Sequence, residues 1–84
     1  MTVIWVPTAL DELAEIWMQG DTAQRNAINT ATNLIDEELA TDPHLKGESR
    51  SKGRRIFFAP PLGIFFKIMP QDMLVRVLHV WQYG

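Results

Sequence analysis

Hydrophobic positions follow a helical period in the first half of the chain and a strand period in the second half. Apolar residues of the first half recur every three or four positions, at Leu10, Leu13, Ala14 and Trp17 and then at Ala27, Ile28, Ala31, Leu34, Ile35 and Leu39. This spacing places each set on one face of a helix. It predicts a helix from Thr8 to about Met18 and a longer one that ends before Pro43.

Capping signals predict where these two helices begin. Thr8 and Asp11 have the spacing of a capping box at the start of the first helix, and Asp21 and Gln24 have it at the start of the second. Gly20 separates the helices, so only a few residues join them. Helices joined by so short a link are expected to pack as an antiparallel hairpin.

Strand-like segments lie on both sides of this hairpin. They are residues 2–6, 54–59, 63–69 and 73–82. The last three are joined by short turns, which is typical of a β-meander, whereas residues 44–53 are polar and contain glycine, which predicts a loop. The order β-α-α-β-β-β predicts an α+β fold for residues 1–84 as a single domain, with the helical hairpin packed on a mainly antiparallel sheet.

The strands are unusually apolar for a sheet with one solvated face. Ile56-Phe57-Phe58 and Ile64-Phe65-Phe66 are continuously apolar, whereas such a sheet should alternate. The pattern has two interpretations. In the first, other parts of the chain cover the second face of the sheet, or a single aromatic residue is left exposed there. In the second, this face forms a hydrophobic groove that binds a segment of a partner protein.

A period of two divides the last strand into two faces. One is predicted to carry Met73, Val75, Val77, His79, Trp81 and Tyr83, and the other Leu74, Arg76, Leu78, Val80 and Gln82. Arg76 interrupts an apolar row, either as a side chain that reaches water at the edge of the core or as a cation in a shallow site. His79 is either a hydrogen-bonded packing residue or a catalyst.

The net charge of −2 hides an asymmetry between the two halves of the chain. Residues 1–42 carry eight acidic side chains and one basic one, a net charge of −7, whereas residues 43–84 carry seven basic and two acidic ones, a net charge of +5. Such a division predicts a molecule whose basic part meets a polyanion or an acidic partner.

Basic residues are concentrated in one short segment, at Lys46, Arg50, Lys52, Arg54 and Arg55. Such a cluster can bind phosphate groups, because arginine offers paired donors and lysine a point charge. It is equally typical of a solvated loop that keeps a protein soluble.

Several kinds of chemistry are not expected. The 84 residues, of which 46% are hydrophobic and 21% charged, include no cysteine, so disulfides and thiolate chemistry are excluded and a reducing cytoplasm is expected. The two histidines, His44 and His79, lie far apart in sequence, and the acidic residues at 36–38 point in different directions on a helix, so neither a metal site nor a cofactor is expected.

Targeting signals are not expected either. No basic region precedes the apolar residues at the N-terminus, which predicts that the chain has no signal peptide. The longest strongly apolar stretch, residues 56–66, is much shorter than the roughly 20 residues that a membrane-spanning helix needs. No membrane insertion is therefore expected.

Short segments spread over nearly the whole chain match a known pattern in order and spacing. They are Trp5-Val6-Pro7-Thr8-Ala9, Leu13 with Ile16-Trp17, Ile35-Asp36 with Leu39, Asp42-Pro43, Gly47-Glu48-Ser49-Arg50, Gly53-Arg54-Arg55 and the residues from Val75 to Trp81. Together they resemble the RelE/ParE superfamily of toxins from bacterial type II toxin–antitoxin modules. The fold of that superfamily is the helical hairpin on a small sheet that the periodicity predicts.

The resemblance implies a cytoplasmic toxin that a cognate antitoxin neutralises. Some members of the superfamily cut mRNA on the ribosome without a metal, by promoting attack of a ribose 2′-hydroxyl on the adjacent phosphate. On this basis the expected catalytic residues are Arg54, Arg55, Arg76 and His79. The expected phosphate-binding residues are Arg50, Lys52, Arg54 and Arg55, and the expected antitoxin-binding residues are Phe57, Phe65, Trp81 and Tyr83.

The resemblance also leaves alternatives open. Leu62-Gly63 stands where nuclease members often have an arginine, and Gln82-Tyr83-Gly84 follows Trp81 where a histidine and a basic tail are common. ParE-like members, which inhibit DNA gyrase and lack the nuclease residues, fit these features too. A toxin-like binding protein without activity is the third alternative.

Overall fold

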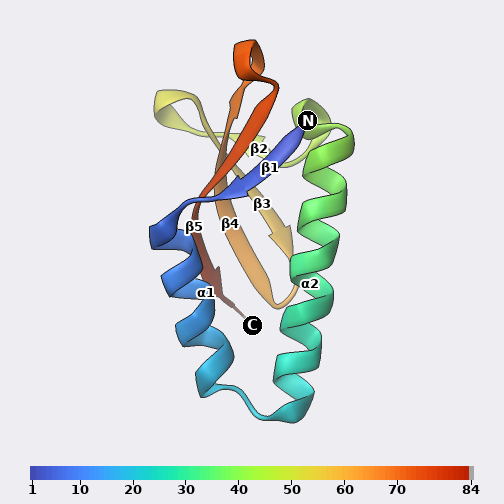
Figure 1. The fold of residues 1–84 in the computed structure, drawn as a ribbon, viewed down its shortest axis with the longest axis vertical. Helices are drawn as coiled ribbons and strands as arrows, with labels where there is room; N and C mark the ends of the chain where they lie inside the picture. Colours follow the sequence, from blue (N-terminus) through green and yellow to red (C-terminus); the bar gives the residue numbers. More distant parts are fainter. Residues whose placement is uncertain (84) are drawn as a thin grey trace.

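Two helices and a five-stranded sheet form the two layers of the computed structural model, which describes residues 1–83 (Figure 1). The elements are β1 (Thr2–Trp5), α1 (Pro7–Gln19), α2 (Thr22–Thr41), β2 (Glu48–Ser49), β3 (Arg54–Ala59), β4 (Leu62–Met69) and β5 (Leu74–Gln82), with single 3-10 turns at Pro43–Leu45, Ser51–Gly53 and Pro70–Asp72. The predicted α+β fold and the two predicted helices are confirmed. The segment predicted as a loop contains a strand, β2, which was missed because two residues carry no periodic signal.

The sheet has the strand order β1-β5-β4-β3-β2. β3, β4 and β5 form the predicted antiparallel meander, and β2 pairs antiparallel with β3. β1 pairs parallel with β5, at the opposite end of the sequence, so the sheet is mainly but not wholly antiparallel. The helical hairpin is the long connection that returns the chain from β1 to the far edge of the sheet (Figure 1).

The two helices begin in different ways. Asp21 and Gln24 form the predicted capping box, in which each side chain accepts a hydrogen bond of 2.8 Å from the other residue's backbone N–H. The capping box predicted at Thr8 and Asp11 is wrong, because the N-cap residue of α1 is Val6, two positions before Thr8, and it provides no side-chain cap. Pro7 provides this start, since its fixed φ angle suits the first helical position and it has no N–H that needs an acceptor.

The core lies between the helices and one face of the sheet. Its fully buried members include Ile28, Ala31, Ile35 and Leu39 of α2, Leu62, Ile64 and Phe66 of β4, and Val75, Val77 and Val80 of β5. Among the described residues no polar or charged residue is buried. Among these residues, too, no helix combines the length and the apolar character needed to cross a membrane.

A β-bulge at Leu78 changes which residues of β5 face the core. Phe65 of β4 pairs with His79, whereas the next residue, Phe66, pairs with Val77, so Leu78 is an extra residue in β5. A bulge of this kind shifts the alternation of side chains by one position. The buried positions of β5 are therefore odd-numbered before the bulge, at Val75 and Val77, and even-numbered after it, at Val80. The prediction that Arg76 and His79 lie on opposite faces of the sheet is wrong for this reason.

Candidate functional site

One face of the sheet is turned away from the helices, and we call it the open face. In β4, residues on the two faces alternate, and Leu62, Ile64 and Phe66 point into the core. The strand register then assigns to the open face Arg54, Ile56 and Phe58 of β3, Gly63, Phe65 and Lys67 of β4, and Arg76, His79 and Trp81 of β5. The bulge brings Arg76 and His79 onto this common face.

A row of three cations crosses the open face. Arg54 pairs with Lys67 across β3 and β4, and Lys67 pairs with Arg76 across β4 and β5. Like charges placed directly opposite one another in a sheet destabilise it. None of the ion pairs among residues 1–83 includes a member of this row, so no acidic side chain of the described part offsets the repulsion. The basic row is therefore suited to bind an anion.

Aromatic side chains lie beside the basic row. The centre of the Trp81 ring lies 5.1 Å from the centre of the Phe65 ring and 6.2 Å from that of the Phe58 ring. The ring centres of Phe58 and Tyr83 are 5.1 Å apart. We call these four residues the aromatic cluster. The Arg54 guanidinium carbon lies 5.6 Å from the centre of the Phe65 ring, which joins the cluster to the basic row.

Gly63 makes room for this arrangement. A Cβ atom added to Gly63 would lie 2.6 Å from Cε2 of Trp81, so the indole rests against the backbone of β4. Phe58 is 49% exposed and Tyr83 is 37% exposed, so the aromatic cluster presents apolar surface to solvent. The two continuously apolar strands are thereby explained: alternate residues pack against the helices and the others form the open face.

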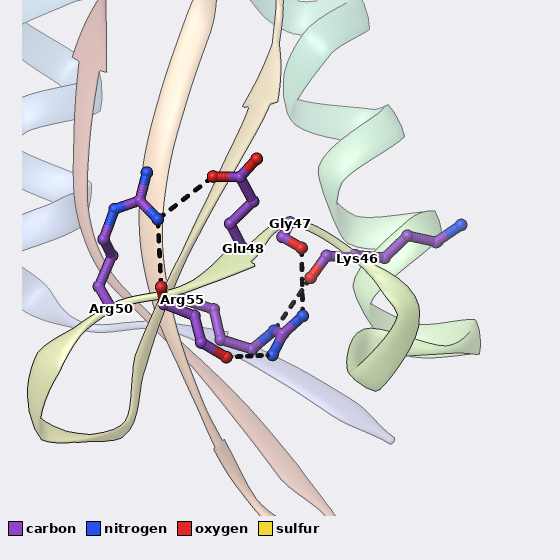
Figure 2. A network of polar contacts seen from close by, with 6 residues as sticks. Lys46, Gly47, Glu48, Arg50 and Arg55 are labelled. Carbon is purple, nitrogen blue, oxygen red and sulfur yellow. Dashed lines mark hydrogen bonds and ion pairs between the residues drawn. The ribbon is translucent and has the colours of Figure 1, made fainter.

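A second group of basic residues is bound within the loop that contains β2 (Figure 2). The Arg55 guanidinium donates three hydrogen bonds, of 3.0 Å to the Lys46 carbonyl, 3.2 Å to the Gly47 carbonyl and 2.9 Å to the Ser49 hydroxyl. Because Ser49 pairs with Arg55 across β2 and β3, the guanidinium lies alongside the loop that it holds. We call this arrangement the loop clamp.

Two other loop cations also have acceptors. Lys46 forms an ion pair of 2.6 Å with Glu38 of α2. Arg50 lies 3.2 Å from the Glu48 carboxylate and donates to the Ser49 carbonyl at 3.1 Å (Figure 2). Most of the basic cluster seen in the sequence therefore holds the loop together. Lys52 is exposed, and it has a positive φ angle of 63°.

The structure brings together some of the residues expected from the sequence and separates others. Arg54, Arg76 and His79 lie on the open face, whereas Arg55 lies on the other face and belongs to the loop clamp. Phe65, Trp81 and Tyr83 belong to the aromatic cluster. Phe57 is separate from them, because it packs against the core.

Lys67 was missed in the sequence. It is the only charged residue in β4 and was read as part of an apolar strand. The short turn between β3 and β4 was the available signal, because antiparallel pairing through that turn places Lys67 opposite Arg54. Among residues 1–83 there is no group of three or more side chains arranged to hold a metal ion.

His79 has a partner from the helical layer. Its Nδ1 atom lies 3.3 Å from each carboxylate oxygen of Glu12 in α1. The backbone N–H of Val80 donates to the same carboxylate at 3.2 Å. The site therefore combines a row of cations, an aromatic surface and a histidine with a carboxylate beside it.

The fold is that of the RelE/ParE toxins of type II toxin–antitoxin systems, as the sequence resemblance predicted. No family model and no curated protein matches the chain. The likeness to solved structures extends over nearly the whole chain at low sequence identity, so it establishes the fold.

The particular structures come from three bacteria. A chain of the RelBE2 toxin–antitoxin complex of Mycobacterium tuberculosis superposes with a TM-score of 0.75 at 15% identity, covering 96% of this chain and 88% of that one. For a chain of the chromosomal ParDE system of P. aeruginosa the TM-score is 0.68 at 16% identity, and the match covers 100% of this chain and 97% of that one. For the isolated RelE toxin of E. coli it is 0.64 at 13% identity, with coverage of 99% and 84%.

Proposed function

We propose that this protein is the toxin of a type II toxin–antitoxin module and that it cleaves RNA on the open face of its sheet. The observation that carries the proposal is the basic row of Arg54, Lys67 and Arg76, which has no acidic partner within residues 1–83 and lies beside exposed aromatic side chains. Cations bind the phosphates of a single strand, and aromatic rings stack on its bases.

The chemistry needs no group beyond these side chains. His79 accepts the proton of a ribose 2′-hydroxyl, and the 2′-oxygen attacks the adjacent phosphorus. The bond to the 5′-oxygen breaks, and that oxygen takes up a proton from water while His79 returns its own proton to the solvent, which leaves a 2′,3′-cyclic phosphate and a 5′-hydroxyl. The basic row stabilises the negative charge that develops on the phosphoryl oxygens. In this proposal the substrate is mRNA on the ribosome, and the protein acts in the bacterial cytoplasm.

The same face offers a site for the antitoxin. An antitoxin segment that neutralises the toxin places apolar side chains on the aromatic cluster and acidic side chains on the basic row. Phe58, which is 49% exposed, and Tyr83, which is 37% exposed, offer apolar surface there. Bound antitoxin and RNA then exclude each other, which explains how the toxin is held inactive.

Inhibition of DNA gyrase is a second candidate function. It rests on the match to a chain of the chromosomal ParDE system of P. aeruginosa, which has a TM-score of 0.68 and of which this chain covers 97%. In this case the open face binds the antitoxin and a protein target, and His79 has no catalytic role.

Induced expression in bacteria separates these functions. Cleaved mRNA and arrested translation are expected for the wild-type chain and are abolished when the basic row carries R54Q, K67Q and R76Q together. The control is R50Q, which removes an exposed cation outside the row. Intact mRNA with altered DNA supercoiling would assign the gyrase function instead, and normal growth would assign an inactive toxin-like protein.

A further inference from the structure

The contact between Glu12 and His79 joins two layers of the molecule at the edge of the open face. The residues are 67 positions apart in sequence, and they meet because α1 packs beside β5 (Figure 1). Both carboxylate oxygens of Glu12 lie at the same distance, 3.3 Å, from Nδ1 of His79. The carboxylate therefore faces one particular ring nitrogen.

The backbone of β5 holds this carboxylate in place. β1 pairs with β5 only from Leu74 to Val77, so the strand has no neighbour on that side at Val80. The backbone N–H of Val80 instead donates a hydrogen bond to Oε1 of Glu12, with an N–O distance of 3.2 Å. A buried or half-buried N–H without an acceptor is costly. Glu12 thus replaces a missing strand partner, and this fixes its position relative to His79.

The chemistry of the carboxylate determines which proton His79 carries. An ionised carboxylate only accepts hydrogen bonds, so the Nδ1 atom that faces it must be protonated. In the neutral ring Nε2 then has a free lone pair that can accept a proton, while the Nδ1–H stays directed at Glu12. These are the properties required of a general base.

We propose that Glu12 is a positioning residue for His79, and that its carboxylate holds the imidazole as the Nδ1–H tautomer with Nε2 free to accept a proton. The role of this tautomer in RNA cleavage rests on the proposed function, whereas the tautomer itself does not. The side chain of His79 is 46% exposed, so a substrate on the open face can reach the imidazole.

The tautomer is measured directly by long-range ¹H–¹⁵N correlation NMR of the ¹⁵N-labelled chain, above the pH at which its histidines lose their charge. We expect wild-type His79 to carry its proton on Nδ1. The substitution E12A should move the proton largely to Nε2, which is the tautomer that free histidine favours. The matched control D11N removes a carboxylate from the neighbouring exposed position of α1 and should leave His79 unchanged.

The result that overturns the proposal is a wild-type His79 protonated mainly on Nε2, or an E12A spectrum in which the His79 tautomer is unaltered. The wild-type spectrum decides the question even when E12A fails to fold. Loss of a merely structural contact would lower stability without exchanging the tautomer.

Cleavage assays test the consequence for catalysis. E12Q should reduce kcat by about a hundredfold, less than the roughly 10⁴-fold loss seen when a buried triad aspartate becomes asparagine, because the Glu12–His79 pair is partly exposed. Adding E12Q to H79Q should cause no further loss. A wild-type chain that cleaves no RNA refutes the proposed function and leaves the NMR result to decide the positioning role. Cleavage that is insensitive to E12Q refutes the positioning role alone.

Discussion

Arg54 and Arg55 are neighbours in β3 but serve opposite purposes. The guanidinium of Arg55 donates three hydrogen bonds to the loop around β2, so its charge holds the fold together (Figure 2). Arg54 lies on the other face, opposite Lys67; its guanidinium carbon lies 5.6 Å from the centre of the Phe65 ring, and its side chain forms no ion pair within residues 1–83. The cation of the loop clamp thus has acceptors within the protein, whereas the cations of the basic row have no acidic partner among residues 1–83.

This difference shows how a run of basic residues should be interpreted. Cations whose donors are already bound within the protein contribute to stability and offer little to a ligand. Cations held side by side without acidic partners destabilise the sheet, and an anion relieves that repulsion. The density of basic residues in the sequence is highest in the loop, whereas the basic row that we propose as the site lies on the strands.

The largest effects are expected from the basic row. R54Q, K67Q and R76Q, made singly, should each lower RNA cleavage by about 10²–10³-fold, the usual loss when a donor to the transition state is removed. The free energy of unfolding should stay the same or rise by up to about 1 kcal/mol, because each substitution relieves like-charge repulsion and breaks no ion pair in the described part of the chain. Cleavage kinetics and urea unfolding measure the two quantities. An equal loss of activity in R50Q would remove the distinction between row and loop.

The next largest effect is expected at Gly47 in the loop. This residue has a φ angle of +67°, and an added Cβ would lie 2.0 Å from the carbonyl oxygen of Ile56. G47A should therefore lower the free energy of unfolding by about 3 kcal/mol or more.

A matched glycine provides the control for this substitution. Gly53 has a similar φ angle of +73°, but its added Cβ would meet only Cε of Lys67, at 3.8 Å. G53A should cost about 1–2 kcal/mol, the cost of the left-handed conformation alone. Equal losses in the two variants, measured by urea unfolding, would show that the close approach of Gly47 to β3 is not what shapes the loop.

Removing the loop clamp should have a moderate effect on stability. R55M keeps an aliphatic side chain but removes three hydrogen bonds, so the free energy of unfolding should fall by about 1–3 kcal/mol. Amide hydrogen exchange in residues 46–49 should become faster. R50M should cost no more than about 0.5 kcal/mol, because its ion pair with Glu48 is exposed. A stable R55M variant with lost RNA cleavage would instead place Arg55 in the active site.

The smallest effect is expected at the aromatic cluster. In G63A the new methyl group would collide with the Trp81 indole, which has to move away from β4. We expect a loss of about 1 kcal/mol in stability and a changed NMR shift of the Trp81 indole N–H, together with weaker binding of single-stranded RNA. An unchanged indole resonance would show that Gly63 does not determine where Trp81 lies.

Local signals were sufficient for much of the fold. The apolar spacing in α2 and the capping box of Asp21 and Gln24 predicted that helix, and the short turns predicted the meander. The sequence predicted only part of the open face: it grouped Arg54, Arg76 and His79, which the structure places on one face, but it also grouped Arg55, which lies on the other face, and it left out Lys67. The run of basic residues in the sequence directed attention to the loop. Lys67 was left out because a single lysine inside an apolar strand is not part of any such run.

What the sequence determined by itself is the identity of the elements, because helical period, capping and tight turns depend on residues only a few positions apart. What the tertiary structure decided is which side chains meet. The bulge at Leu78 sets the face of His79, the sheet register aligns Arg54, Lys67 and Arg76, and the packing of α1 beside β5 brings Glu12 to His79. Each of these depends on contacts between segments distant in the chain, whose relative placement no local pattern encodes.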